Sequence, residues 1–546
     1  MNNIHNLFFN LCNKKGSRKP GAAGCHENKM YKSATPLKPN QGSIVWSINN
    51  SKSRALIKGF DFTKIAANFL LVATLATSCT KDFKEINTDP NRIDAISPGT
   101  LLNPIIYNMA GYNMQRADDI TFSLMQVSLP FPSASGGLHR YDIAENAGNG
   151  TWNTSYLWLN NVKEMYNTSV TLADNNYQAI ALTLHAWLYA NLTDCFGDVP
   201  MKEATQGDKG ILRPKFDTQQ EIYTTLLGNL DSANNMYLTT KTMLFGTEIL
   251  YANNVAKWKK FTNSLRMRLL LRLSKKTEMN AMVRLREMID NPVKYPVFTS
   301  NDDGAILKLS GITPFASPWG RPIDFTTFRA ASKFFLDSLN AFNDPRRARF
   351  ASQARNSAGT ANIGYQGIPS GYAGSESQFA YIPSNLLQSL VTASSASVVP
   401  MSVVIMPYAE VEMIKAEVEF KSNNAVAAKA AYEKGVKAAV EQWGGVMPAD
   451  YFTNAATMGA TAYNNTLHRI LLQKYYALFF VDFQQWFEYR RTGMPVLPMA
   501  GAIAGKPMPT RFRYPIAVRT NNPENYKKAV EIMGGDENTT KVWWEK

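Results

Sequence analysis

Residues 466–491 read TLHRILLQKYYALFFVDFQQWFEYRR, and apolar side chains cover nearly every face of the helix that this stretch predicts. Two separate sides are apolar, one formed by Ile470, Ala477 and Phe480 and the other by Leu471, Tyr475 and Leu478. A helix that is apolar all round belongs in the interior of a packed protein. The stretch therefore predicts a central helix with other helices around it.

Three amphipathic helices are expected upstream of this stretch. In residues 178–194, apolar positions recur at helical spacing until the segment FGDVP breaks the pattern. Residues 216–233 predict a second helix, capped by Asp217 with Gln220 three residues later as in a capping box. Residues 256–276 place Trp and Leu on one stripe and end in basic residues, which suits a helix C-terminus.

Charged residues near these stripes are expected on solvated surfaces. Arg266 and Arg272 lie mostly outside the apolar stripe of the third helix. Two carboxylate pairs are predicted to be a solvated loop and a solvated helix face, namely Asp302 with Asp303 and Glu417 with Glu419.

A helical hairpin is predicted from residues 408–422 and 427–443. Small residues recur on the two facing stripes, among them Ala409, Ala416 and Gly435. Small side chains let two helix axes approach closely, as in tetratricopeptide-like helix pairs. The 34-residue consensus of those repeats is absent, so the repeats are predicted to be degenerate.

Long stretches without a helical period separate these helices. They are rich in Gly, Ser, Asn and Pro and cover residues 129–150, 300–325, 356–400 and 444–465. Long loops in a compact domain usually carry function or lack order. Because these loops also hold aromatic residues, they are predicted to form the working surface. The aromatic residues are Phe131, Tyr141, Phe315, Trp319, Tyr365, Tyr372 and Tyr381.

An export signal is predicted near the N-terminus. Residues 65–79, IAANFLLVATLATSC, follow several basic residues and hold an apolar run that is shorter than the ~20 residues a membrane span needs. The run ends in small residues before Cys79, which resembles the lipobox of bacterial lipoproteins. We therefore expect residues 1–78 to be an upstream extension plus a removed signal peptide, and Cys79 to be lipidated.

The net charge of residues 79–546 argues against a nucleic-acid partner. Residues 1–78 contain 11 Lys or Arg against 2 acids, so they hold +9 of the net +15 and leave +6 for residues 79–546. Such a mild surplus is ordinary for a soluble surface and gives no support for nucleic-acid binding.

Residues 79–546 are expected to form a single domain. Its only cysteine besides Cys79 is Cys195, so no disulfide is expected within it.

Catalytic and metal motifs are absent from the sequence. Residues 79–546 contain three histidines, His139, His185 and His468, and lack a G-x-S-x-G elbow, an H-E-x-x-H pair or a Cys/His cluster. His185 is expected to be a structural histidine. We expect no enzyme, no cofactor and no metal site, although an anchored hydrolase with two carboxylates stays an alternative.

Several segments, in one order along the chain, resemble the SusD/RagB family of outer-membrane lipoproteins, and its SusD-like branch in particular. The segments include DFKEINTDPN from Asp82, DCFGDVP from Asp194, KWKKFTNSLRMRLLLRLS from Lys257, YAEVEMIKAE from Tyr408, QKYYALFFVDFQQWFEYRRTGMP from Gln473 and RFRYPIAVRTNNPENYKKAV from Arg511. The resemblance covers nearly all of residues 79–546. It implies a mostly α fold with about four tetratricopeptide-like helix pairs that support long irregular ligand-binding loops.

The resemblance also implies a function. Family members capture nutrients at the cell surface for a SusC-type TonB-dependent transporter, and their ligands are commonly glycans, or peptides in the RagB branch. An outer-membrane, lipid-anchored, surface-facing protein that binds an oligosaccharide is therefore expected. A RagB-like peptide-binding protein and a helical scaffold that binds only protein remain alternatives.

The ligand is predicted to bind the aromatic loops. Prolines at every fourth position, Pro314, Pro318 and Pro322, stiffen the loop that carries Phe315 and Trp319. Tyr141 is predicted to form the opposing wall, and Tyr372 in another long loop is a further candidate. Trp319→Ala is expected to weaken binding with little change in stability, whereas a packing role would have the reverse effect. The tryptophans at 152, 158, 187, 258 and 486 are assigned to the core.

Overall fold

A computed structural model describes residues 96–393 and 400–546, and helices make up more than half of these residues. Residues Ile93–Lys546 form one compact unit, and the expected boundary at residues 78 and 79 lies outside the described residues. The predicted mostly α fold is confirmed. The longer helices are α3 (Pro98–Arg116), α5 (Asn149–Thr171), α6 (Asn175–Phe196), α7 (Gln219–Met236), α8 (Val255–Arg272), α9 (Ala281–Asp290), α12 (Tyr408–Lys421) and α13 (Ala425–Gln442).

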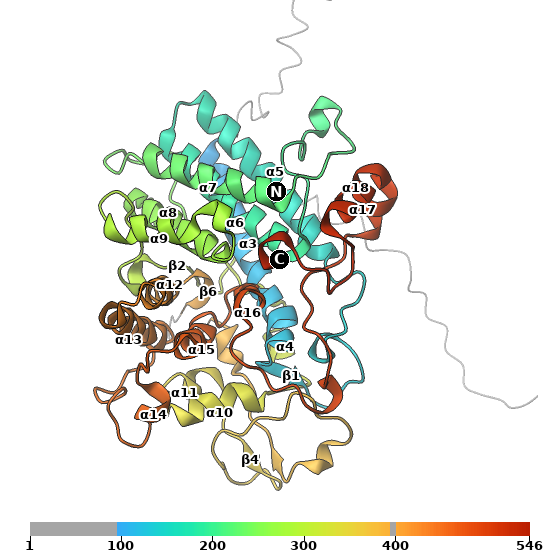
Figure 1. Cartoon of the computed structure of the whole chain (residues 1–546), viewed down its shortest axis with the longest axis vertical. Coiled ribbons are helices and arrows are strands. Elements are labelled where there is room, and N and C mark those ends of the chain that lie inside the picture. Colours follow the sequence, from blue (N-terminus) through green and yellow to red (C-terminus); the bar gives the residue numbers. More distant parts are fainter. Residues whose placement is uncertain (1–95, 394–399) are drawn as a thin grey trace, which may run out of the picture. The chain divides into compact units, whose positions relative to one another are not determined.

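These helices pack in neighbouring pairs. Helix α3 packs on α5, α6 on α7, α8 on α9 and α12 on α13, and the contacts of α5 with α6 and of α7 with α8 join successive pairs. In Figure 1 the pairs follow one another down one side of the molecule from α5 and α7 to α13. The shorter helices are α4 (Phe122–Leu124), α10 (Lys333–Ala341), α11 (Arg347–Phe350), α14 (Met458–Thr461), α15 (Leu467–Ala477), α16 (Gln484–Thr492), α17 (Ile516–Asn521) and α18 (Pro523–Met533).

The hairpin of α12 and α13 depends on the small residues that the sequence placed there. A Cβ atom on Gly435 would lie 2.8 Å from Met413 Cε, 3.3 Å from Glu412 Cβ and 3.4 Å from the Ala409 carbonyl oxygen. A side chain at position 435 would therefore require Met413 to move and would fit tightly against α12.

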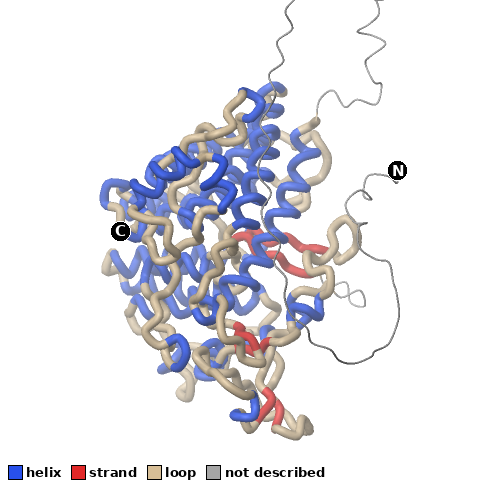
Figure 2. The backbone as a smooth tube through the Cα atoms, turned by 90° about the vertical axis from the view of Figure 1, so that its right-hand side faces the viewer, coloured by secondary structure: helices blue, strands red, loops and turns tan. Residues whose placement is uncertain are grey.

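Strands are short and occur as three antiparallel pairs in the described chain (Figure 2). The predicted irregular stretch 300–325 begins with one of them, because β2 pairs with the strand that precedes α12. The pairs are β1 (Ser128–Pro130) with β3 (Arg329–Ala331), β2 (Ala305–Leu309) with β6 (Met401–Met406), and β4 (Arg355–Asn356) with β5 (Tyr381–Ile382). The first two pairs tie a loop to a segment far away in the sequence, whereas β4 and β5 pair within one irregular stretch.

The capping residues of α7 differ from those predicted. Thr218, not Asp217, is the N-cap, and it forms a capping box with Glu221 instead of Gln220. The Asp217 carboxylate accepts hydrogen bonds from the backbone N–H groups of Met201 at 2.8 Å and Lys202 at 2.9 Å. The predicted capping box was therefore one residue too early in the sequence, because Asp217 holds the preceding loop instead of capping α7.

The predicted single helix over residues 466–491 is wrong, because a turn at residues 478–483 separates α15 from α16. Phe480 and Asp482 have positive φ values of 64° and 32° in this turn, which no α-helix can contain. The Asp482 carboxylate accepts a hydrogen bond of 3.0 Å from Asn191 Nδ2 on α6. The central position of the stretch is nevertheless as predicted, since Trp486 and Phe479 are fully buried.

Several charged residues that were predicted to be solvated are buried instead. Arg491 on α16 makes two 2.7 Å hydrogen bonds to Glu417 on α12 and a third to Glu488. Glu488 also accepts 2.7 Å from Lys474 on α15, and Arg272 on α8 lies 3.3 Å from it. This group of five residues, called the Arg491 cluster below, joins four helices in the protein interior.

Asp302 is exposed, as predicted, but three other charge assignments fail for the same reason. Arg266 pairs with Asp231 at 2.7 Å, and Glu419 pairs with Arg286 at 2.8 Å. Asp303 is buried and accepts hydrogen bonds from Lys260 at 2.8 Å and from the Thr299 backbone at 2.9 Å. A charge near an apolar stripe can be buried when a partner from another helix meets it.

The Arg491 cluster should make the free energy of unfolding depend on pH in the acidic range. Burial alone would raise the pKa of Glu417, but Arg491, with Lys421 and Lys474, lowers it to about 2. Because an unfolded glutamate titrates near ~4.3, the ion pair contributes stability that is complete above that pH and is lost as the pH falls toward 2. Between pH 6 and pH 3 the wild-type protein should lose about 2 kcal/mol more unfolding free energy than Glu417→Gln.

Urea unfolding at a series of pH values measures this difference. The Glu417→Gln variant itself should be less stable by about 3–5 kcal/mol at neutral pH, because Arg491 loses its partner. Glu524→Gln, at an exposed position of α18, is the control and should keep the wild-type pH dependence. Equal pH slopes for the wild type and Glu417→Gln would contradict the role given to this ion pair.

Candidate functional site: an aromatic groove beside α3 and α5

A groove opens where α3 and α5 meet the loop of residues 310–322. Helical spacing explains which residues face it, since Tyr107, Gly111 and Gln115 lie four apart on α3, and Thr154 and Trp158 lie four apart on α5. Each helix therefore contributes one stripe of side chains to the groove.

Side chains of α3 donate hydrogen bonds to backbone carbonyl groups of this loop and hold the loop against the helix. Tyr107 donates to the Ala316 carbonyl at 2.9 Å, and Gln115 donates to the Pro318 carbonyl at 2.7 Å. From the other side, Ser317 donates to the Val391 carbonyl at 2.8 Å. The loop is thus a fixed wall of the groove.

The groove combines aromatic faces with uncharged hydrogen-bonding groups. Its volume is about 330 Å³, within the range of ligand pockets. Three half-buried aromatic side chains, Tyr107, Tyr112 and Trp158, line it. The polar residues that line it are Asn108, Gln115, Thr154 and Ser317.

The electrostatics of the groove suit binding more than chemistry. None of its lining residues is an acid, a lysine or a histidine, so it offers no general acid or base of the usual kind. The Arg116 guanidinium lies 4.9 Å from the centre of the Tyr112 ring and holds that ring in place. Burial raises the pKa of Tyr112, so its hydroxyl stays protonated and neutral at physiological pH. The arrangement can stack against a ring and exchange hydrogen bonds.

Comparison with known proteins identifies the family. The SusD-like family model, described as starch-binding and associating with the outer membrane, matches residues 90–515. The chain belongs to the SusD-like family. This confirms the family that the sequence motifs resembled, although DFKEINTDPN, which starts at Asp82, lies outside the residues that the structure describes.

Solved structures of SusD-like proteins share the fold. A chitin-binding protein is 25% identical, with a TM-score of 0.69 over 82% of this chain and 100% of that chain. A SusD homologue from Bacteroides fragilis is 22% identical, with a TM-score of 0.68 over 83% and 100%. A chitin-binding SusD homologue from Flavobacterium johnsoniae is 20% identical, with a TM-score of 0.67 over 82% and 98%. No curated protein matches the chain.

The predicted residues Phe315 and Trp319 lie in the loop that closes the groove of this SusD-like protein. The Phe315 ring packs edge-on against Tyr107, with 5.9 Å between centroids. Trp319 is half-buried and packs edge-on against Phe325 at 5.8 Å and Phe480 at 6.3 Å. Both rings therefore contact the helical domain, and the loop faces the groove through Ser317 and Pro318.

Neither Tyr141 nor Tyr372 is among the residues that line the groove. The Tyr141 side chain is 7% exposed, and its hydroxyl accepts a 3.1 Å hydrogen bond from Gln126. Tyr372 donates to the Pro130 carbonyl at 2.9 Å and borders a second cavity of about 490 Å³. No aromatic or hydrogen-bonding contact joins Tyr141 to Trp319 within the described residues, so the predicted opposition of these two residues has no direct contact to support it.

Sequence reasoning missed three groove residues, Tyr107, Tyr112 and Trp158. Trp158 was assigned to the core, yet it is half-buried. A signal was present, because the buried positions of α5 include 152, 155, 159 and 162, and position 158 falls off that stripe. The tryptophans at 152, 187, 258 and 486 are buried, as predicted.

None of the described helices is long and apolar enough to cross a bilayer. In residues 96–393 and 400–546, no group of three His, Cys, Asp or Glu side chains is placed to hold a metal ion. The expected lipidation site, Cys79, lies outside the described part of the chain.

The contacts of Trp319 lead to a prediction about stability. Because its ring packs against Phe325 and Phe480, Trp319→Ala should lower the unfolding free energy by about 1–3 kcal/mol, and Trp319→Phe should restore part of it. Urea denaturation of the three proteins measures the effect. An unchanged unfolding free energy together with a loss of ligand binding would show instead that Trp319 is a free platform for the ligand.

Proposed function

We propose that this protein is an outer-membrane lipoprotein that captures an oligosaccharide in the aromatic groove and delivers it to a SusC-type TonB-dependent transporter. The composition of the groove is the observation that carries the proposal. Half-buried aromatic rings beside amide and hydroxyl groups, with no acid or base among the lining residues, favour binding of a neutral, hydroxyl-rich ligand.

Sugar rings suit such a groove for two reasons. Their C–H faces are apolar and stack on Tyr107, Tyr112 or Trp158, while their hydroxyls exchange hydrogen bonds with Asn108, Gln115 or Thr154. The loop over residues 310–322 is already held by hydrogen bonds to α3, so binding has little ordering entropy to overcome.

The comparisons support the ligand class. The family is described as starch-binding, and two of the similar solved structures are named as chitin-binding. Glucose-based and N-acetylglucosamine-based oligosaccharides are therefore the first ligands to test. Transfer to a transporter, anchoring through Cys79 and the absence of catalysis are parts of the same proposal.

Trp158→Ala should weaken oligosaccharide binding at least about tenfold, the effect of losing about 1.4 kcal/mol of contact. Isothermal titration calorimetry with chitohexaose and maltohexaose measures the affinity. Leu157→Ala is the matched control, because Leu157 is the neighbouring α5 residue, is 62% exposed and does not line the groove.

Four outcomes would contradict this proposal. An equal loss for Leu157→Ala would place the ligand on another side of α5. Unchanged affinity of Trp158→Ala would remove the groove from the binding site. Binding of a peptide library in place of every oligosaccharide would favour a RagB-like function. Release of reducing ends during incubation would indicate an enzyme.

Lipid anchoring should be lost in Cys79→Ser. One acyl chain gives only marginal membrane binding, whereas two or more hold a protein stably. Mass spectrometry of the mature N-terminus and fractionation of cells that express each form test the anchor. An unmodified Cys79, or a serine variant that stays with the membrane fraction, would rule out this attachment.

A further inference from the structure

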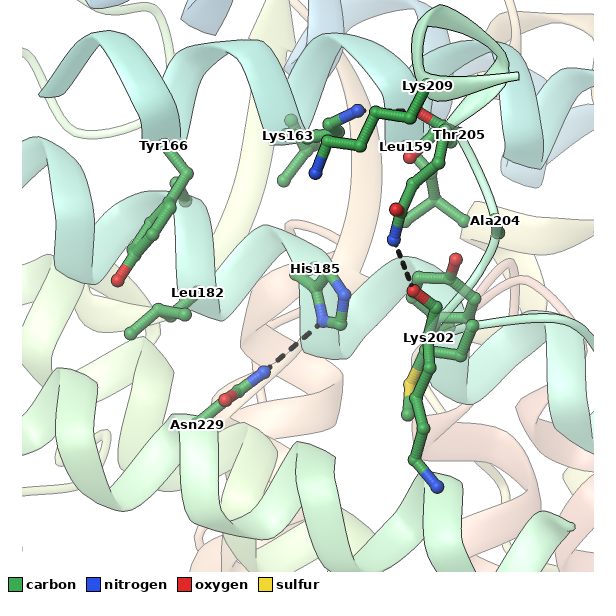
Figure 3. Close-up of a pocket in the computed structure, with 15 residues that line it drawn as sticks. Leu159, Lys163, Tyr166, Leu182, His185, Lys202, Ala204, Thr205, Lys209 and Asn229 are labelled. Atoms are coloured by element: carbon green, nitrogen blue, oxygen red, sulfur yellow. Dashed lines mark hydrogen bonds between the residues drawn. The ribbon is translucent and has the colours of Figure 1, made fainter. Parts of the chain in front are cut away.

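A polar cavity, separate from the groove and from the cavity beside Tyr372, lies between α5, α6, α7 and the loop after α6. Figure 3 shows it, with Lys163 and Lys209 together on one side and His185 and Asn229 on the other. Its volume is about 290 Å³, near the ~300 Å³ lower end of small-molecule pockets. It shares no lining residue with the aromatic groove.

The charged residues that line this cavity are all basic. They are Lys163, Lys202 and Lys209, and no aspartate or glutamate lines it. Lys202 points away from the other two and is neutralised outside the cavity by Asp217 at 3.2 Å and Glu221 at 2.8 Å.

The other two lysines leave the cavity positive. Lys163 donates a 2.5 Å hydrogen bond to the Thr205 carbonyl, and its nearest carboxylate, that of the exposed Asp208, is 3.6 Å away. Lys209 makes no ion pair within the described residues. An anion that entered the cavity would meet at least one ammonium group without a counterion.

An unpaired hydroxyl also points to a ligand. Tyr189 lines the cavity with only 3% of its surface exposed, yet its hydroxyl has no hydrogen-bond partner in the part of the chain that the structure describes. The hydroxyl oxygen is not among the fully enclosed unpartnered atoms of the described chain, so it is accessible from the cavity that Tyr189 lines. A bound molecule with a polar atom near Tyr189 would supply a hydrogen-bond partner.

The imidazole of His185 adds a neutral contact. Its Nδ1 lies 3.4 Å from Asn229 Nδ2, and its ring is 4.6 Å from the Tyr189 ring. Burial lowers the pKa of His185 to about 4, so the ring is uncharged at neutral pH and can donate or accept a hydrogen bond. The polar wall opposite the lysines is therefore uncharged.

We propose that this cavity binds a small polyhydroxylated carboxylate of monosaccharide size, a hexuronate being the simplest example. The carboxylate lies toward Lys209 and Lys163, and the hydroxyls lie toward Tyr189, His185 and Asn229. The cavity volume is of the size of a single sugar ring. A site of this kind would let the protein sense or retain an acidic monomer independently of the groove.

Calorimetry on the whole mature protein at low salt tests the site with D-glucuronate as the probe. D-glucose is the neutral analogue, since it differs by replacement of the carboxylate with a hydroxymethyl group. Glucuronate should bind at one equivalent and at least tenfold more tightly than glucose, and raising the salt concentration should weaken its binding, because the lysines are partly solvated.

Two variants locate the binding, and two others serve as controls. Lys209→Ala should weaken glucuronate binding at least fivefold, and Tyr189→Phe, which keeps the ring, at least threefold. Lys527→Ala, at an exposed α18 lysine that makes no ion pair in the described chain, is the control and should bind as the wild type does. Trp158→Ala should also leave glucuronate binding unchanged, which separates this site from the groove.

The proposal is overturned if glucuronate binds no more tightly than glucose, or if Lys209→Ala and Lys527→Ala have equal effects. Tighter binding of inorganic phosphate than of glucuronate would also overturn it, because the cavity would then select a compact anion. Melting temperatures of the variants within a few degrees of the wild type confirm that each affinity is that of a folded protein.

Discussion

The ion pair between Arg491 and Glu417 fixes the interior on which the rest of the molecule is built. Both residues are almost fully buried, and two 2.7 Å hydrogen bonds join them. Breaking one side of such a pair costs about 3–5 kcal/mol, because the other charge is left in the interior. Since the pair and its neighbours Glu488, Lys474 and Arg272 come from α8, α12, α15 and α16, these helices can pack together in few ways.

The groove depends on this interior through a chain of contacts. The turn at residues 478–483 leads into α16, and its Phe480 ring packs against Trp319. The Thr121 hydroxyl, just beyond α3, donates a 2.8 Å hydrogen bond to the Asp482 carbonyl of the same turn. The turn thus positions the end of α3 and the loop of residues 310–322 together, and these are two of the three walls of the groove. The walls of the groove in which we propose that the glycan binds are therefore held in fixed positions.

Apolar periodicity was enough to predict α6, α7, α8 and the α12–α13 hairpin, because local spacing determines which face of a helix is buried. It could not predict the turn at residues 478–483, since Asp482 is held by Asn191, 291 residues away. The burial of Glu417 could not be predicted for the same reason, because its partner Arg491 belongs to another helix. The loop of Trp319 was located correctly from its prolines, whereas Tyr107 and Tyr112 lie on α3, for which the sequence analysis predicted no helix.

Hydrogen–deuterium exchange of the protein with and without chitohexaose or maltohexaose, whichever binds, tests the location of the ligand site most directly. If the groove binds the glycan, peptides from α3, from the first half of α5 and from residues 310–322 exchange more slowly in its presence, and peptides from α12 and α13 do not change. Protection confined to residues 369–378 and 498–501, around the cavity beside Tyr372, would contradict the assignment.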